Sequence, residues 1–418
     1  MLDIQFIRDN AKSVKKATAD KGFDAKVIDQ LIQVDEKRRH LIQHAEKLRA
    51  ERNNLNDQLK IDRNPELIAQ SKDLKSQLEK VEAEQKAVNT NYLDLMYKIP
   101  NPSAADVKVG NEVDNEVLRQ VGKPKDFGFT VRDHVELGTL TNTIDITAGT
   151  KVAESGFYYM KGMGAMLEFA LVQYALQKLA QKGFTPVITP NLANEQSVIG
   201  CGFQARSDKE RQIYHVEGED LDLIATAEIT LVGQHQDTTL NAQVLPLKYA
   251  GYSSCYRYEK GSYGKDVRGI FRVHEFRKVE MVVFCLPEDS NKIHEQLREI
   301  EEEIWQELEI PYQVIKQATG DLGNAASRKY DLEAWMPAQK RYREVTSTSN
   351  TTDFQARRLG IKVQRNGGTE FIHTLNGTIL ALGRAIIAIY ENYQNEDGSI
   401  KVPTVLQKWV GTDTIPLI

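Results

Sequence analysis

The sequence predicts an α+β protein, in which a domain built on an antiparallel sheet flanked by helices follows an antiparallel helical coiled-coil hairpin. Three observations support this. Residues 27–97 contain no glycine and one proline and are rich in Glu, Lys, Arg, Gln and Leu, as long helices are. Beyond residue 103, short β-rich runs such as FTPVITP and KVEMVVFCL alternate with helical runs such as AMLEFALVQYALQKLAQ. Residues 255–280 read as a hairpin with a charged turn.

The long helical segment carries a heptad repeat on both sides of one break. Its apolar positions recur every seven residues, with a second row four residues on. The first limb holds Val27, Val34, Leu41, Leu48 and Leu55 with Leu31, Ala45 and Leu59, and the second holds Leu67, Leu74, Val81, Val88 and Leu95. Pro65 would disrupt a helix interior, so we expect two antiparallel limbs, each spanning roughly 50 Å.

Basic residues on this arm are candidate phosphate contacts. Arg38 lies near the seam, where its stem can pack while its head reaches water, and Arg39, Lys47 and Arg49 lie outside it. A solvated helix face is the alternative for each one alone, so the prediction depends on the shape of the arm. The Pro-containing segment IPNPSAADVKVG then reads as a linker and divides the chain into domains 1–103 and 104–418.

Whole-chain properties exclude several classes of protein. With 418 residues, two domains are expected, and a net charge of −5 excludes a uniformly basic nucleic-acid coat while allowing local basic surfaces. Cys201, Cys255 and Cys285 follow no CxxC spacing, which disfavours a disulfide framework and a structural zinc site. No apolar run is long enough to cross a bilayer, and MLDIQFIRDN has neither a secretory nor a transit pattern. We therefore expect a cytoplasmic protein.

The hairpin at residues 255–280 concentrates the chemistry. Strand alternation would put one set of side chains on a single face: Cys255, Arg257, Glu259, His274, Phe276, Lys278 and Glu280. Guanidinium groups bind phosphate oxygens bidentately and a phenyl ring stacks on a base, so this face suits a nucleoside triphosphate. A solvated, salt-bridged hairpin is the alternative interpretation.

Three blocks in order resemble the signature motifs of class II aminoacyl-tRNA synthetases, and in detail those of the seryl-tRNA synthetases. The first is the helix and strand at about 164–190, the second is the hairpin at about 255–280, and the third is TLNGTILALGRAIIAIYENYQ at about 374–394. TAE at 226–228, YREVTSTSN at 342–350 and the N-terminal arm extend the resemblance over nearly the whole chain. Two departures are Gly156, where the family commonly carries an arginine, and Ile379 after Thr378.

The resemblance implies a role for each matching residue. It implies ATP contacts by Arg257, Glu259, Val273, Phe276, Glu344, Val345, Thr346, Ser347 and Arg384. It implies L-serine contacts by Thr226, Glu228, Arg257, Glu280, Asn376 and Thr378. Glu344 and Ser347 would bind Mg²⁺, and Arg257 and Arg384 would be catalytic. The acceptor end of tRNA(Ser) would lie near residues 262–268, and Arg38, Arg39, Lys47 and Arg49 would contact the tRNA of a homodimer.

The expected activity is serine–tRNA ligation. Attack of the serine carboxylate on the α-phosphate of ATP brings two anions together, so positioning and charge neutralisation are the main tasks. Alanine lacks the hydroxyl of serine and would leave buried polar groups of the site unpaired, so the site would bind alanine poorly. A catalytically inactive paralogue that binds RNA or protein is the alternative, although it would not need Arg257, Glu280, Glu344 and Arg384. A carrier-protein ligase would lack the arm and carry a cysteine-rich metal site.

Overall fold

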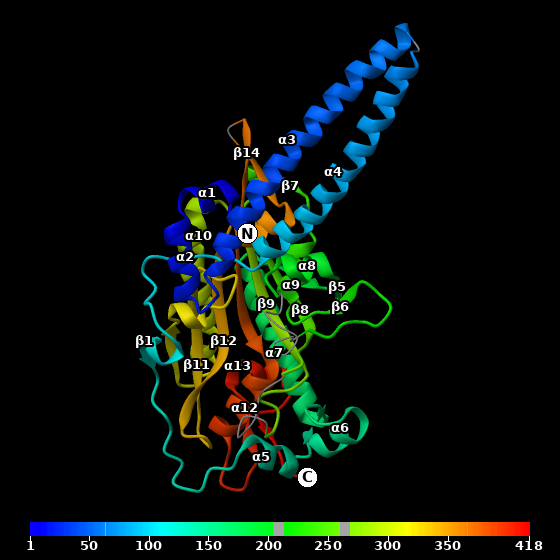
Figure 1. Cartoon of the computed structure of the whole chain (residues 1–418). Coiled ribbons are helices and arrows are strands. Elements are labelled where there is room, and N and C mark those ends of the chain that lie inside the picture. The colour runs from blue at the N-terminus through cyan, green and yellow to red at the C-terminus, as the bar shows by residue number, and fades with distance from the viewer. Residues whose placement is uncertain (63, 204–212, 260–267, 366) are drawn as a thin grey trace. The chain divides into compact units, whose positions relative to one another are not determined.

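The computed structural model describes residues 1–62, 64–203, 213–259, 268–365 and 367–418 (Figure 1). The chain divides into two compact units, Met1–Pro102 and Ser103–Ile418. No helix within the described ranges has an apolar stretch long enough to cross a bilayer.

The first unit consists, in its described part, of two short and two long helices, which are α1 Ile4–Asp9, α2 Ala11–Asp20, α3 Lys26–Ile61 and α4 Pro65–Tyr97. Asp3 caps α1 by accepting hydrogen bonds from the backbone of Gln5 and Phe6. Asn64 caps α4, and Pro65 takes the first helical position, where its missing N–H costs nothing. The break in the helical pattern predicted at Pro65 therefore coincides with the start of the second limb.

The long helices α3 and α4 pack side by side as a coiled-coil hairpin (Figure 1). Each predicted seam position is buried or half-buried, from Val27 at the base to Leu55 near the tip. The apolar cluster at the base includes Ile28, Leu31 and Leu95, with α1 and α2 covering it. Burial of each large aliphatic side chain contributes about 1.5–3 kcal/mol, so the seam and the base hold the limbs together.

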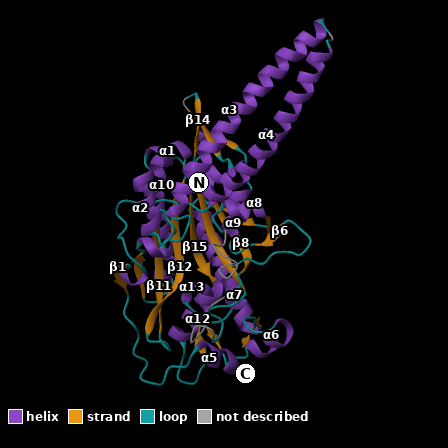
Figure 2. Cartoon of the chain, viewed as in Figure 1, coloured by secondary structure: helices purple, strands orange, loops and turns teal. Residues whose placement is uncertain are grey.

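The second unit is organised around an eight-stranded sheet with the order β1-β10-β11-β12-β15-β9-β8-β4. Figure 2 shows strands in orange and helices in purple. The pairs are antiparallel except β4 with β8, which is parallel. Its strands are β1 Glu116–Val121, β4 Thr185–Ile188, β8 Leu247–Tyr256, β9 Glu275–Cys285, β10 Tyr312–Lys316, β11 Arg328–Met336, β12 Arg341–Thr352 and β15 His373–Ala381. The class II type of fold predicted from the sequence is confirmed.

One face of the sheet is covered by helices, and the main core lies between the sheet and these helices. These helices are α7 Gly162–Gln181, α10 Ser290–Glu307, α12 Leu382–Tyr393 and α13 Thr404–Val410. Along β9, Val279, Met281 and Val283 point into this core. The alternate residues Lys278 and Glu280 point to the other face, because successive strand side chains alternate. The polar half of β9 is thus left to line a pocket.

Shorter elements close the opposite face and the edges. Helices α8 Glu195–Gly200, α9 Ala227–Gly233 and α11 Phe354–Leu359 pack with Val282 and Phe284 in a second core. The remaining helices are α5 His134–Leu140, α6 Ile146–Ala153, and the single turns η1 Glu112–Asp114, η3 Ala242–Val244, η5 Pro287–Asp289 and η6 Thr319–Asp321. Small sheets join β2 Ile144–Asp145 to β3 Tyr159–Met160, β5 Leu192–Asn194 to β6 Leu221–Leu223, β7 Thr239–Asn241 to β13 Lys362–Arg365 and β14 Gly368–Phe371, and β16 Ile400–Lys401 to β17 Thr414–Ile415.

Candidate active site

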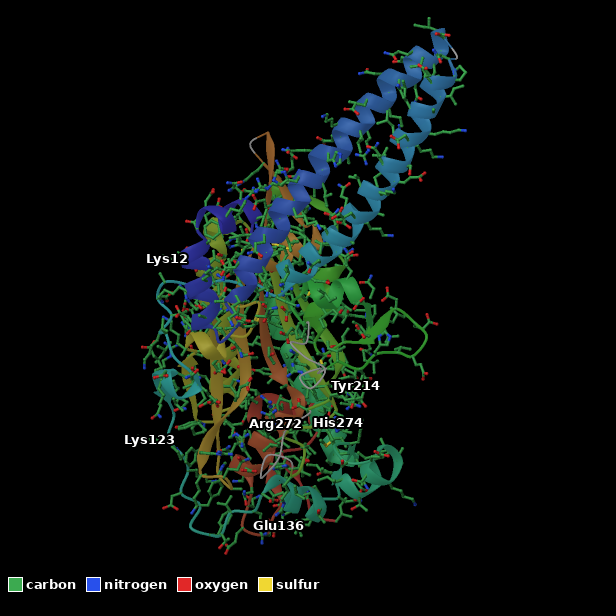
Figure 3. All side chains as sticks on the ribbon, viewed as in Figure 1. Lys12, Lys123, Glu136, Tyr214, Arg272 and His274 are labelled. Carbon is green, nitrogen blue, oxygen red and sulfur yellow. The ribbon has the colours of Figure 1, made fainter. Side chains whose placement is uncertain are left out.

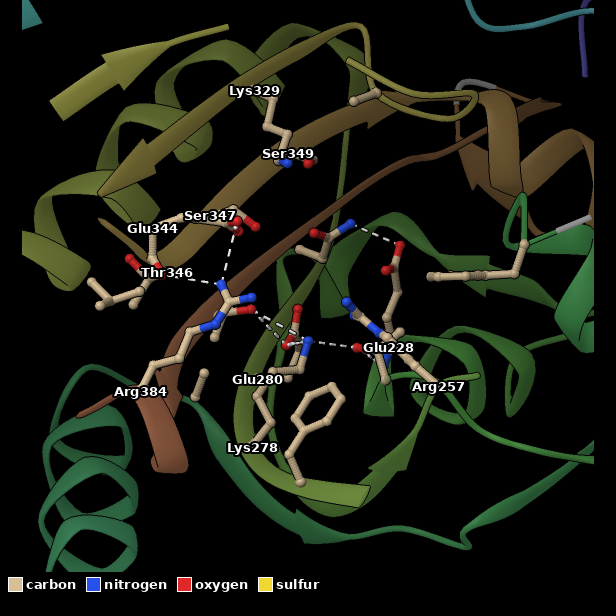
Figure 4. A pocket seen from close by; sticks show the side chains of 18 of the residues that line it. Glu228, Arg257, Lys278, Glu280, Lys329, Glu344, Thr346, Ser347, Ser349 and Arg384 are labelled. Carbon is tan, nitrogen blue, oxygen red and sulfur yellow. Dashed lines mark hydrogen bonds and ion pairs between the residues drawn. The ribbon is translucent and has the colours of Figure 1, made fainter. Parts of the chain in front are cut away.

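A pocket of about 320 Å³ opens on the polar face of the central strands β12, β15 and β9 (Figure 4). It collects every residue that the sequence assigned to ATP, serine or metal: Thr226, Glu228, Arg257, Glu259, Val273, Phe276, Glu280, Glu344, Val345, Thr346, Ser347, Asn376, Thr378 and Arg384. These residues come from segments up to 158 positions apart, so the fold alone brings them together.

The start of α9 supplies two of these residues. Thr226 is the N-cap residue, with extended backbone, and its hydroxyl accepts a hydrogen bond from the backbone N–H of Glu228. Glu228 then lies in the first helical turn, with its side chain 7% exposed. Its Oε1 accepts hydrogen bonds from Asn376 Nδ2 at 2.7 Å and from Gln355 Nε2 at 2.6 Å.

Burial makes Glu228 titrate near neutral pH. Loss of solvent raises the pKa of its carboxyl group, and the nearby carboxylate of Glu280 raises it further. Hydrogen bonds from Gln355 and Asn376 and the charge of Lys278 act in the opposite direction, and the resulting pKa is about 7. The charge of the part of the pocket around Glu228, which we call the recess, therefore changes within the physiological pH range.

A buried ion pair forms the floor of the same recess. Lys278 pairs with Glu280 on the same face of β9, and both side chains are nearly inaccessible. The ammonium of Lys278 also donates to the hydroxyls of Thr226 at 2.8 Å and Thr378 at 3.3 Å. Thr378 in turn donates to Glu280 Oε2 at 3.1 Å. Carboxylates, hydroxyls and one ammonium thus face a space suited to a small zwitterion.

Arg257 leaves the end of β8 and enters the pocket from its rim. Its backbone N–H donates to the carbonyl of His274, and its guanidinium lies 5.1 Å from the ring centre of Phe276. Its Nη2 donates to the carbonyl of Ala225 at 3.4 Å. The phenyl ring and the guanidinium are therefore placed for a base and a phosphate.

His274 points away from this pocket, which corrects the single face predicted for the hairpin. The centre of its ring lies 5.5 Å from that of Phe157 and, edge to face, 6.4 Å from that of Tyr214. Its backbone N–H donates to the carbonyl of Gly156. Gly156 has φ of +84°, and a Cβ there would lie 2.4 Å from the imidazole, so the family's common arginine could not fit without movement.

Glu259 reaches the pocket from the loop beyond Arg257. Its backbone has φ of +45°, and its Oε2 pairs with Arg272 Nη1 at 2.9 Å. Arg272, labelled in Figure 3, also lines the pocket. The predicted acceptor-end turn at residues 262–267 lies outside the described residues, and only Arg268 of that prediction is described.

Glu344 and Arg384 form the other end of the pocket. Arg384 is in the first turn of α12, and its Nη1 lies 3.3 Å from Glu344 Oε2. Burial alone would raise the pKa of Glu344, but the charges of Arg384, Lys329 and Arg257 lower it to about 2. The ring centre of Phe271 lies 4.7 Å from the Arg384 guanidinium and supports it from the side. This end therefore presents cations around an ionised carboxylate.

The neighbouring positions on β12 point in different directions because a bulge interrupts the pairing of β11 and β12 between Leu332 and Glu333. Ser347 stays on the pocket face, opposite Asp331 of β11. Val345 belongs to the main core. The hydroxyl of Thr346 donates to Glu301 Oε2 of α10 at 3.2 Å, so this hydroxyl is engaged below the sheet.

The oxygen ligands at this end suit Mg²⁺, which also binds water and substrate phosphates, better than a metal that needs three or more protein side chains. Among the described residues, no group of three or more His, Cys, Asp and Glu side chains could enclose a metal. Glu344 remains ionised, and Ser347 adds a hard hydroxyl oxygen on the same strand. Mg²⁺ commonly uses one or two carboxylates together with water and substrate phosphates, which is what these residues allow.

Sequence reasoning missed several pocket residues. Lys278 was assigned to the hairpin face but not to a binding site, although strand alternation with Phe276 and Glu280 could have indicated it. Lys329, whose ammonium lies 3.5 Å from Asp331, comes from a strand with no recognised motif. Gln355 does not line the pocket but donates a hydrogen bond to Glu228, and no local pattern could have connected these two residues.

The four arm residues belong to the first unit, and their side chains are differently engaged. Arg38 donates to Asn89 at 2.8 Å and stacks on Tyr92, so it ties the two limbs together. Arg39 lies 3.3 Å from Asp35 while its side chain is 51% exposed. Lys47 pairs with Glu51 at 4.0 Å and Arg49 with Glu82 at 2.7 Å, both at exposed positions.

Two family descriptions match this chain. Residues 1–102 match the seryl-tRNA synthetase N-terminal domain, and residues 212–393 match the class II tRNA synthetase core domain for glycine, histidine, proline, serine and threonine. Full-length relatives agree. The serine–tRNA ligase of Rubrobacter xylanophilus is 46% identical over 421 residues, covering 99% of both chains.

Solved structures are also similar over the whole chain. The seryl-tRNA synthetase from Pyrococcus horikoshii, complexed with ATP, superposes with a TM-score of 0.91 at 38% identity and covers 100% of both chains. The cytoplasmic serine–tRNA ligase from Naegleria fowleri, in complex with AMP, gives a TM-score of 0.86 at 32% identity, covering 100% of this chain and 99% of that one.

Proposed function

The chain belongs to the seryl-tRNA synthetase family, and we propose that its pocket activates L-serine with ATP and transfers it to tRNA(Ser). The protein is a serine–tRNA ligase, an ATP-dependent enzyme of class II. One observation carries the proposal for the site: a recess with Glu228, Glu280 and Thr378 adjoins two arginines and an ionised Glu344 in a single pocket.

The recess suits the serine end of the reaction. Thr226 and Glu228 would bind the ammonium group, because an ionised buried carboxylate attracts a cation strongly in a site of low dielectric. Glu280 and Thr378 would bind the serine hydroxyl. Alanine would leave these polar groups unpaired, and that desolvation penalty provides discrimination. Threonine would be excluded by lack of space.

The cationic end suits the triphosphate. Phe276 would stack on adenine, Arg257 would lie between the serine carboxylate and the α-phosphate, and Arg384 would bind the γ-phosphate. Serine is ionised at its carboxylate at neutral pH, so no general base is needed for the first step. Mg²⁺, when bound by Glu344 and Ser347, would neutralise charge on the phosphates. Arg257 and Arg384 then lower the repulsion between the two anions.

The coiled-coil unit is proposed to bind tRNA. A rigid helical hairpin suits an RNA recognised by shape through its backbone. Arg39, Lys47 and Arg49 are more accessible for phosphate than Arg38, which bridges the limbs. Loss of these contacts would weaken RNA binding with little sequence preference.

A homodimer is proposed through the first motif. On α7, Phe169 is 65% exposed and Met166 44% exposed, and Ile188 of β4 is 86% exposed. Large exposed apolar side chains on one helix and strand are typical of subunit interfaces. We also propose a cytoplasmic location, which is supported by three cysteines that are all free and buried.

The test is serine-dependent exchange of pyrophosphate into ATP, followed by aminoacylation of tRNA(Ser). We expect both activities, with Mg²⁺ required. A folded protein that binds tRNA but shows no exchange with serine would support the inactive-paralogue alternative instead.

A further inference from the structure

The carboxylate of Glu228 is oriented by a residue that does not reach the pocket. Gln355 follows the first residue of α11 and is 1% exposed. Its Nε2 donates to Glu228 Oε1 at 2.6 Å and to the carbonyl of Cys201 at 3.2 Å. Gln355 therefore contacts the back of the proposed ammonium-binding group rather than the substrate.

The orientation of the Gln355 amide is itself fixed. Its Oε1 accepts hydrogen bonds from the hydroxyls of Thr374 at 2.7 Å and Thr351 at 3.3 Å. The reverse orientation would place the amide oxygen against a carboxylate and a carbonyl, both acceptors. The two threonines thus select the orientation in which Gln355 donates to Glu228.

Two amide donors act on the same oxygen of Glu228. Gln355 and Asn376 both donate to Oε1, and neither bonds to Oε2. Asn376 lines the pocket on β15, whereas Gln355 approaches from α11. Two donors on one oxygen fix the plane of the carboxylate and favour its ionised form.

We propose that Gln355 is a positioning residue that orients the carboxylate of Glu228 toward the ammonium group of serine. This proposal rests on the proposed function. It assigns to Gln355 a role in the binding of serine and none in the binding of ATP. Two consecutive hydrogen bonds, from Thr374 to Gln355 and from Gln355 to Glu228, connect β15 with the recess.

The principal variant is Gln355→Met, which preserves length and removes both hydrogen-bonding groups. We expect the KM for serine in pyrophosphate exchange to rise about tenfold to a hundredfold, as for loss of a hydrogen bond to a charged group. The KM for ATP should stay within about twofold. The acidic limb of kcat/KM for serine should move to higher pH, because protonation of Glu228 becomes easier without the donor.

A matched control is Gln394→Met. Gln394 is also 1% exposed, and its amide makes hydrogen bonds with Arg132 and Glu391 away from the pocket. This variant measures the general cost of losing a buried glutamine. It should leave the KM for serine and the acidic limb unchanged.

A second readout isolates the ammonium group. 3-Hydroxypropanoate is serine without its amino group, and its inhibition constant in the exchange assay should be the same for wild type and Gln355→Met. A loss of affinity for both compounds would show a general disturbance of the recess and overturn the proposal.

A milder variant keeps the proposal testable should Gln355→Met fold poorly. Thr374→Val removes the hydroxyl that orients the amide and should raise the KM for serine by about threefold to tenfold, with the same direction of pH shift. Unchanged KM and acidic limb in either soluble variant would overturn the inference. Absence of serine-dependent exchange in the wild type would instead refute the proposed function, so the two failures are distinguishable.

Discussion

Arg384 contacts both the main chain and the side chain of Glu344. Its Nη1 donates to the carbonyl oxygen of Glu344 at 3.0 Å and lies 3.3 Å from Glu344 Oε2. The first turn of α12 is thereby connected to β12 at the end of the pocket that is proposed to bind the triphosphate. The same guanidinium is the strongest of the nearby charges that lower the pKa of Glu344. One arginine thus sets both the position and the ionisation of its neighbour.

Replacing Arg384 with methionine should therefore have two effects. Exchange activity should fall by about a thousandfold, because a cation facing the γ-phosphate is lost. The pKa of Glu344 should rise, because the largest of the charges that lower it would be removed. Residual activity in the variant should consequently increase with pH, whereas wild-type Glu344, with a pKa of about 2, stays ionised throughout the neutral range. Rates measured from pH 5 to 9 check this, and parallel profiles would contradict it.

Arg257→Ala should abolish adenylate formation, since this side chain is proposed to lie between the two reacting anions. We expect a loss of about a thousandfold or more in exchange. Arg365→Ala is the control, because Arg365 at the end of β13 pairs with Glu288 of η5 and does not line the pocket. An unchanged exchange rate in Arg257→Ala would remove this residue from the mechanism.

The pKa of about 7 for Glu228 predicts an acidic limb in kcat/KM for serine, with activity falling as the carboxyl is protonated below neutral pH. Glu228→Gln should lower kcat/KM by about a hundredfold and remove this limb. The same substitution should increase the stability of the folded protein above neutral pH although it lowers activity. A folded pKa above the unfolded value makes the wild type lose stability as pH rises from about 4.5 to about 7. Thermal unfolding at pH 8 should show the variant to be the more stable protein.

Shortening the arm should separate the two reaction steps. Replacing residues 42–85 with a short glycine-serine turn retains the base cluster with Ile28, Leu31 and Leu95. Exchange should stay within about twofold of wild type, while aminoacylation should fall by more than about a hundredfold because phosphate contacts are lost. Equal loss of both activities would argue against a separate RNA-binding role for the arm.

Phe169→Asp should yield a monomer. A carboxylate in an apolar interface would be desolvated without a partner, which is strongly unfavourable. Sedimentation velocity distinguishes the two states. Val113→Asp serves as the control, because Val113 is 93% exposed on a different element and should leave the dimer intact. A dimeric Phe169→Asp protein would place the interface elsewhere.

Much of this fold could be predicted because its signals are local. The seam from Val27 to Leu55 follows a seven-residue period, and Asn64–Pro65 marks a helix start, so the arm follows from pattern alone. The strand pair β8 and β9 is adjacent in the chain apart from its loop, and alternation indicated Phe276 and Glu280 correctly.

Other features depend on contacts that no local pattern encodes. The bulge opposite Leu332 turns Thr346 toward Glu301, and it arises from the pairing of two strands. The ring of His274 instead lies against Phe157, more than a hundred residues earlier, and its Nδ1 is 3.0 Å from the carbonyl of Arg257. Gln355 reaches Glu228 only through tertiary packing of α11. Side-chain direction at strand ends and bulges was therefore beyond sequence reasoning.

The ammonium of Lys278 contacts Glu280 and the hydroxyls of Thr226 and Thr378, which are themselves proposed contacts of serine. Serine would therefore bring a second ammonium group to oxygen atoms that already contact one, and the two cations would compete for them. A substitution that displaces the ammonium of Lys278 would therefore change which amino acids bind, although Lys278 is not itself a proposed substrate contact.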